Sequence, residues 1–258
     1  LIWADVIHLI WPRNFINWKI LYFIRKYINT KLVIIFNPVG SDARWLPLAI
    51  YEYEKIGLHV SPYLYEISKK QDNIEVLKEK LKYTSTFIRI SDIVLAQPYY
   101  AQLFTKPYMN YLLPIQVDNY VFNIPNDNHV AILHAATHSG KKGSEFVRST
   151  IENLKKEKLN FKYLEFFDLN NSELRKKLST ADIVIYNPYG MGLGKFGLEA
   201  IFSGCLLLTG YPHDYQTLPP NSPILNITTK NLSTTLMHYL INHKERKSKV
   251  LEQYQWAI

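Results

Sequence analysis

A glycine-rich stretch at 190–197 is followed by a carboxylate, Glu199, in a position suited to nucleotide binding. The stretch follows an apolar run typical of a buried strand, 182–186, and precedes a helical pattern at 196–202. Backbone N–H groups of such a loop point toward one place, as does the positive end of the helix dipole, so they favour a phosphate or diphosphate. Glu199, about one turn inside the helix, can accept hydrogen bonds from ribose hydroxyls. Loop and acid together indicate a nucleoside diphosphate ligand.

The same glycines are also compatible with a simple tight turn. Their spacing differs from the phosphate loop G-x-x-x-x-G-K-[ST], and the G-x-G-x-x-G match at Gly192, Gly194 and Gly197 is weak evidence alone. A dinucleotide dehydrogenase is disfavoured, because the loop comes late in the chain and no suitable acid follows ~20 residues on.

A second loop, 134–145, follows the strand-like run 130–133 and carries Lys141 and Lys142 with two histidines and two glycines. A lysine ammonium can neutralise a diphosphate, and glycine lets the chain approach it closely. The common alternative is a solvated lysine pair before a helix. His134 and His138 have no carboxylate or cysteine to complete a cluster, so we expect no metal.

The elements around these loops alternate between strand and helix patterns. Strand-like apolar runs lie at 6–10, 32–36, 93–96, 130–133, 163–167, 183–186 and 205–208, and helical periodicities at 15–28, 74–88 and 146–154. The alternation predicts an α/β protein whose parallel sheets carry helices on both faces. In such sheets ligands bind at the carboxyl ends of the strands, so both loops should face one ligand.

Two domains are predicted, 1–120 and 121–258, with a cleft between them. The segment 114–128 has little apolar periodicity and is rich in Pro, Asn and Asp, which is typical of a linker. A small residue followed by Asp precedes a strand at Asp5, Asp92 and Asp182, and the last two are placed as equivalent points of two similar domains could be.

Composition limits the partners. The 258 residues are 47% hydrophobic with a net charge of +8, which suits an anionic ligand or an anionic membrane surface. No nucleic-acid-binding motif is present. Cys205 is the single cysteine, which favours a reducing, cytoplasmic location. The aromatic and basic helix at 14–28 either docks on its sheet or contacts the inner face of a membrane peripherally.

A family resemblance rests on these same blocks. The run 132–145 resembles the first strand and loop of the second domain in family 4-like retaining glycosyltransferases (group 1) with the GT-B fold. The stretches 178–185 and 194–204 resemble the donor-binding half of that domain. Segments 4–8 and 39–44 are similar, more weakly, to the first domain of the family.

The resemblance implies two Rossmann-like domains and transfer of a sugar from a nucleotide-sugar donor to a glycan or lipid-linked acceptor in surface polysaccharide synthesis. Transfer would retain the anomeric configuration, with neither metal nor cofactor. Lys142 and Gly143 would hold the diphosphate, and Glu199 would bind the ribose. The other implied donor-binding residues are Lys141 or His138 as a second basic group, the backbone of Gly192, Leu193, Gly194 and Lys195, and Phe167 and Leu169 beside the base.

Three departures from the family pattern affect these expectations. Met191 stands where many members have a glutamate near the donor sugar. The usual opening strand and glycine loop would precede Leu1, so we expect an incomplete first domain. No catalytic residue can be assigned; Asp42, with Gly40 on the acceptor-side domain, and His138 are candidates. Two alternatives remain open: a non-catalytic sugar-nucleotide-binding module, and a sugar-nucleotide epimerase, for which we find no acid/base residues.

Overall fold

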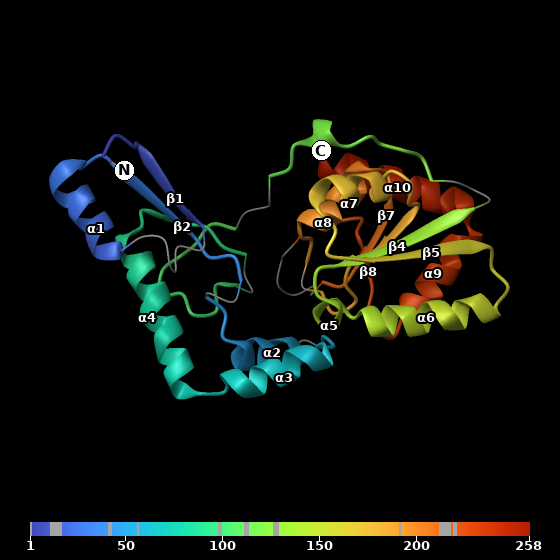
Figure 1. Cartoon of the computed structure of the whole chain (residues 1–258), viewed down its shortest axis with the longest axis horizontal. Coiled ribbons are helices and arrows are strands. Elements are labelled where there is room, and N and C mark those ends of the chain that lie inside the picture. Colours follow the sequence, from blue (N-terminus) through green and yellow to red (C-terminus); the bar gives the residue numbers. More distant parts are fainter. Residues whose placement is uncertain are drawn as a thin grey trace. The chain divides into compact units, whose positions relative to one another are not determined.

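The computed structural model describes residues 2–10, 17–40, 43–55, 57–97, 100–110, 114–125, 129–190, 192–211, 218 and 221–258. They form two compact units, each with its own parallel sheet (Figure 1). Unit 1 comprises Leu1–Glu52 and Tyr65–Leu112, and unit 2 comprises Tyr53–Leu64 and Leu113–Ile258.

The sheet of unit 1 has three strands in the order β1-β2-β3: β1 (Val6–Ile10), β2 (Val33–Asn37) and β3 (Ile93–Val94). The helices between these strands are α1 (Trp18–Phe23), continued by the π-helical turn η2 (Ile24–Ile28), then α2 (Leu46–Lys55), α3 (Pro62–Gln71) and α4 (Ile74–Ile90). Leu21, Phe36 and Phe87 are buried in its core, where the two phenylalanine rings stack with centroids 5.5 Å apart.

The sheet of unit 2 has five strands in the order β5-β4-β6-β7-β8. They are β4 (Val130–Ala136), β5 (Phe161–Phe167), β6 (Ile183–Ile185), β7 (Leu206–Thr209) and β8 (Leu225–Asn226). The helical segments are η4 (Val117–Asn119), α5 (Ser139–Lys142), α6 (Ser144–Lys156), α7 (Asn171–Leu178), α8 (Lys195–Phe202), α9 (Leu232–Ile241) and α10 (His243–Ala257). One face of the sheet packs on α6 and α9 and the other on α7 and α8, so buried cores lie on both sides (Figure 1).

The strand order of unit 2 places a topological switch point between β4 and β6. The chain runs from β4 outward to β5, returns to the other side of β4 at β6, and then continues outward through β7 and β8. In doubly wound sheets, ligands bind outside the carboxyl ends of the strands at this point. Here it lies between Ala136 and Ile185, the last residues of β4 and β6.

The same aspartate contact precedes a strand in each unit. Asp92 Oδ2 accepts a hydrogen bond from the Ile34 amide at 2.9 Å, and Asp182 Oδ2 accepts one from the Ala131 amide at 2.7 Å. Both carboxylates therefore fix the register of a new strand against its neighbour. This explains the aspartate at 92 and 182, whereas at Asp5 the main-chain carbonyl accepts from the Val33 amide at 2.9 Å.

The predicted α/β class and parallel sheets are confirmed. All seven predicted strands are present within a few residues of their expected bounds, as are the helices predicted at 74–88, 146–154 and 196–202. The helix predicted over 15–28 is α1 with η2, and its first two residues lie outside the described chain. The segment 114–125 groups with unit 2, so the change from one unit to the other lies before residue 120.

Candidate functional site

Two loops meet at the switch point of unit 2. One joins β4 to α6 through the short helix α5, and the other joins β6 to α8. Gly143, at the end of α5, has a φ of +66°, and a Cβ there would lie 2.6 Å from the ring of Tyr189. Glycine is required at this position both for backbone conformation and for space, because the loops are in direct contact.

A buried histidine anchors the first loop. His134 is fully buried on β4; its Nδ1 lies 2.8 Å from the Ile185 carbonyl and its Nε2 lies 2.8 Å from Ser144 Oγ. Burial lowers the pKa of His134 to about 4, so the ring is neutral, with Nδ1 donating to the carbonyl and Nε2 accepting from the serine. His134 thus joins β4, β6 and the first residue of α6, and is a structural group rather than a ligand.

Lys142 and Tyr186 connect the two loops. The Lys142 Nζ lies 3.9 Å from the centroid of the Tyr186 ring, a cation–π contact. A Cβ on Gly194, the N-cap of α8, would lie 2.4 Å from Tyr186 Oη. A cation, a phenol and the start of α8 are therefore gathered at one point, and the first N–H groups of a helix have no acceptor inside it. This arrangement can receive an anionic group.

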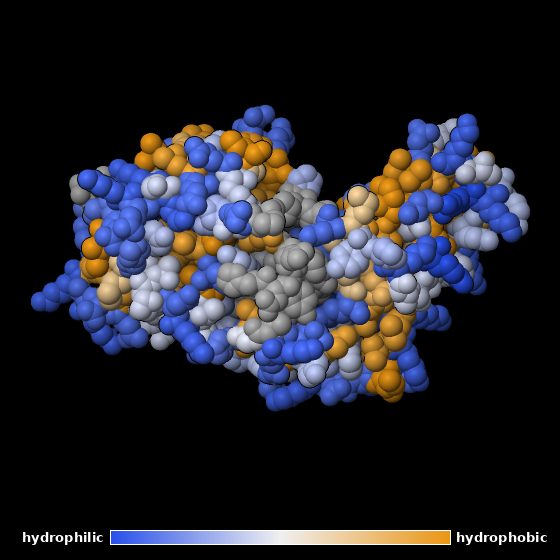
Figure 2. Space-filling view, turned by 180° about the vertical axis from the view of Figure 1, so that it is seen from behind, coloured by the Kyte–Doolittle hydropathy of each residue, from blue (hydrophilic) through white to orange (hydrophobic). Residues whose placement is uncertain are grey.

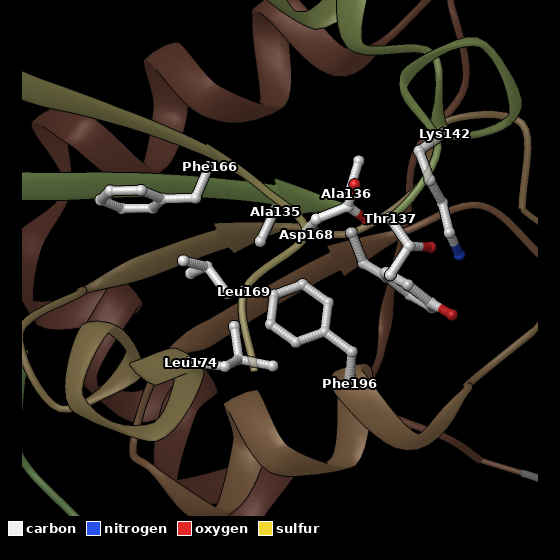
Figure 3. Close-up of a pocket in the computed structure, with 10 residues that line it drawn as sticks. Ala135, Ala136, Thr137, Lys142, Phe166, Asp168, Leu169, Leu174 and Phe196 are labelled. Carbon is white, nitrogen blue, oxygen red and sulfur yellow. The ribbon is translucent and has the colours of Figure 1, made fainter. Parts of the chain in front are cut away.

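Next to this point lies a cavity of about 160 Å³. It is lined by Ala135, Ala136, Thr137, Lys142, Phe166, Asp168, Leu169, Leu174, Tyr186 and Phe196. Figure 3 shows Leu169, Leu174 and Phe196 grouped on one side and Lys142 on the other. Such a cavity, apolar with a cation at its margin, suits a flat base beside a phosphate.

At the end of β5, the side chain that lines this cavity is Phe166, whereas the sequence predicted Phe167. Phe167 is 47% exposed and does not line the cavity, whereas Phe166, Asp168 and the predicted Leu169 do. Successive side chains of a strand point to opposite faces, but both faces of β5 carry a phenylalanine at its end, so the sequence alone could not choose between Phe166 and Phe167.

Glu199 borders a second cavity, of about 290 Å³, together with Tyr120, Asn171, Arg175 and Lys195. Its side chain is only 4% exposed; Oε1 accepts a hydrogen bond from Tyr120 Oη at 2.8 Å and lies 3.6 Å from Lys195 Nζ. Because Phe196 lines the first cavity and Lys195 the second, the first turn of α8 borders both. Lys142 lines the first cavity and Glu199 the second, so both lie near the N-terminus of α8.

Three further residues of the two loops were predicted to bind the donor: Gly192, Leu193 and Lys141. Gly192 has a φ of +133° and its amide donates to the Gly210 carbonyl at 3.3 Å. Leu193 is buried in the core of unit 2, against Gly197. Lys141 is exposed and lines neither of these two cavities.

The two catalytic candidates predicted from the sequence are Asp42 and His138. Asp42 lies outside the described residues. The ring of His138 lies on the ring of Tyr63, with centroids 4.2 Å apart, and within the described chain its Nδ1 is buried without a hydrogen-bond partner. Beside it, Ser61 Oγ donates to the Gly140 carbonyl at 2.6 Å. Gly40, which was predicted with Asp42 on the acceptor-side domain, has a φ of +153°.

Among the described residues, no cluster of three or more His, Cys, Asp or Glu side chains could hold a metal ion. Within the described residues, no helix has the length and apolar character needed to cross a membrane.

The fold is that of a doubly wound α/β protein in which two loops meet at the switch point of the second sheet. No protein-family model and no curated protein sequence matches the chain. Among solved structures, sucrose-phosphate synthase from Thermosynechococcus elongatus matches at 12% identity with a TM-score of 0.63, over 98% of this chain and 69% of that one.

Two further solved structures are similar. Anabaena HepE, solved in complex with UDP-glucose, matches at 11% identity and a TM-score of 0.55, over 97% of this chain and 72% of that chain. WaaG, a glycosyltransferase involved in lipopolysaccharide biosynthesis, matches at 12% identity and a TM-score of 0.52, over 88% and 73%. At these identities the likeness establishes the fold, which is that of GT-B glycosyltransferases.

Proposed function

We propose that this protein is a glycosyltransferase that moves a sugar from a nucleoside diphosphate donor, with UDP as the first candidate. The observation that carries the proposal is the meeting of Lys142, Tyr186 and the start of α8 at the switch point. HepE, which shares this fold, was solved in complex with UDP-glucose, which supports a uridine donor.

In this reaction the bond between the anomeric carbon and the diphosphate breaks, and negative charge accumulates on the departing diphosphate. The Lys142 ammonium, the amides at 194–195 and the α8 dipole would stabilise that charge from fixed positions. Glu199 would accept hydrogen bonds from the ribose, and Phe166, Leu169 and Phe196 would contact the base.

We propose further that transfer retains the anomeric configuration and needs no metal. The sugar would be transferred to a glycan or lipid-linked acceptor in surface polysaccharide synthesis. These points rest on the family resemblance of the two loops. WaaG acts in lipopolysaccharide biosynthesis, which supports this acceptor class. Comparing the anomeric coupling constants of donor and product by NMR tests retention, and an inverted product contradicts it.

A non-catalytic sugar-nucleotide-binding module is the second candidate. Met191 favours it, because a residue without a polar hydrogen-bonding group stands where the family has a carboxylate near the donor sugar. Release of free UDP without a glycosylated product leaves this candidate standing, whereas transfer to any acceptor rejects it.

Peripheral membrane contact by unit 1 would bring the protein to a lipid-linked acceptor. Apolar surface is exposed on this unit (Figure 2), and the exposed side chains of α1 and η2 include Ile20, Phe23 and Tyr27. Lys26 lies among them, with its Nζ 5.0 Å from the centroid of the Tyr27 ring. Aromatic and basic groups on one helix surface suit an anionic bilayer.

Sedimentation with phosphatidylcholine vesicles, with and without phosphatidylglycerol, tests this contact. Lys19→Glu combined with Lys26→Glu should lose the binding to anionic vesicles. Lys141→Glu combined with Lys230→Glu changes the net charge equally on exposed lysines of unit 2 and should retain it. Equal behaviour of both double variants would contradict a contact through α1.

The donor site is tested by calorimetric titration with UDP, GDP and ADP. We expect one nucleotide to bind, and binding to weaken in Lys142→Ala and Glu199→Ala. Absence of binding by a folded chain would reject the proposed donor site.

A further inference from the structure

The segment 114–125 is fixed on unit 2 by specific contacts. It runs along the side of the unit that carries α7, α8 and α10 (Figure 1). The Asn123 amide donates to the Ser203 carbonyl at 3.2 Å, and the Phe122 and Tyr254 ring centroids lie 4.4 Å apart. A Cβ on Gly204 would lie 2.0 Å from the Asn123 carbonyl oxygen, so the approach is as close as a glycine permits.

Tyr120 lies in this segment directly after η4 and points its hydroxyl at Glu199. Its ring packs against the core cluster that contains Phe202, with centroids 6.5 Å apart. The hydroxyl donates to Glu199 Oε1 at 2.8 Å, and Lys195 Nζ lies 3.6 Å from the same oxygen. One carboxylate oxygen is therefore held in place from two directions.

The hydroxyl of Tyr120 stays protonated at physiological pH. Burial, followed by its hydrogen bond to Glu199, raises the pKa of Tyr120 to about 12. A carboxylate has about four acceptor positions on its two oxygens, so a single tyrosine hydroxyl leaves capacity for a ligand. Glu199 is one of the residues that line the cavity of about 290 Å³, from which a ligand could approach it.

We infer that Tyr120 is a positioning residue for donor recognition: it orients Glu199 so that this carboxylate accepts hydrogen bonds from the ribose hydroxyls. The inference rests on the proposed nucleotide-sugar function. It adds to that function a recognition element from outside the two glycine loops, because Tyr120 belongs to the segment that joins β3 to β4. It also predicts selection for ribose over 2′-deoxyribose.

The experiment compares UDP with 2′-deoxy-UDP by calorimetry on wild type and Tyr120→Phe. Wild type should prefer UDP. In Tyr120→Phe we expect about tenfold weaker UDP binding and little change for 2′-deoxy-UDP, so the preference falls. Because both ligands are titrated into the same preparation, the ratio of affinities does not depend on the folded fraction.

Tyr254→Phe is the matched control, since it removes a hydroxyl from another ring of the same core cluster. It should keep the wild-type ratio. Tyr120→Phe in a Glu199→Ala background should cause no further loss, because the side-chain acceptor through which Tyr120 acts is gone.

An unchanged ratio in Tyr120→Phe, with UDP still bound, overturns this inference and leaves the donor site intact. Absence of nucleotide binding by folded wild type overturns the proposed function, and this inference with it. The two failures are thus distinguishable.

Discussion

The ammonium of Lys142 lies 3.9 Å from the centroid of the Tyr186 ring and thereby joins two loops that are far apart in the sequence. Lys142 ends α5, after β4, and Tyr186 directly follows β6. The contact holds the lysine beside a ring whose hydroxyl lies against Gly194, at the start of α8. A cation held by a ring face remains available to an anion.

Lys142→Met should weaken binding of UDP by about ten- to a hundredfold, because a charged contact to phosphate typically contributes about 1.5–3 kcal/mol. Lys141→Met is the matched control, since the adjacent lysine is exposed and lies outside the cavity that Lys142 lines. Calorimetric titration of both variants measures the difference. Equal losses in the two would mean that the loop acts only through its overall charge.

Gly194→Ala should destabilise the fold by about 1–3 kcal/mol, because the new methyl group would lie 2.4 Å from Tyr186 Oη. Urea unfolding measures this loss, and UDP titration should show weaker binding as Tyr186 moves. Tyr186→Phe combined with Gly194→Ala removes the hydroxyl that clashes and should regain part of the stability. Failure of this rescue would place the strain elsewhere.

The sequence predicted the strands well because their residues are buried on both sides, which makes an apolar run sufficient evidence. β4, β6 and β7 are of this kind. β8 was missed, because it has only two residues, Leu225 and Asn226, and pairs at the edge of the sheet. α10 was missed for another reason: it is largely polar and buries Arg246 and Gln253 beside Val250.

The loops of the site were predictable from their glycines, but the contacts that complete the site were not. Tyr120 lies 79 positions before Glu199, and no local pattern connects them. His134 could be given no role from the sequence, and it is buried between β6 and α6. Long-range pairings of this kind depend on the folded topology rather than on spacing.

Asp182→Ala should lower the free energy of unfolding by about 1.5–3 kcal/mol. The substitution removes the acceptor for the buried Ala131 amide, which lies 2.7 Å from Asp182 Oδ2. Asp182→Asn keeps an oxygen in this position and should cost less. Urea midpoints of both variants give the comparison. If both variants match wild type, the carboxylate does not fix the register of β6.

Stability should decrease in mild acid because of His134. Burial lowers its pKa from 6.5 to about 4 in the folded protein. Below pH 6.5 the unfolded chain binds a proton that the folded chain does not, so the free energy of unfolding falls as the pH decreases toward 4. Integration between pH 7.5 and pH 5 gives a loss of about 2 kcal/mol from this one group.

His134→Gln isolates the contribution of the imidazole. A glutamine amide can donate to the Ile185 carbonyl and accept from Ser144 Oγ, the two contacts of His134, but it does not titrate. Urea unfolding at pH 7.5 and pH 5 should therefore show a smaller acid-induced loss in the variant than in wild type. Identical losses would mean that other groups cause the acid sensitivity, and that His134 is protonated in the folded protein as readily as in the unfolded chain.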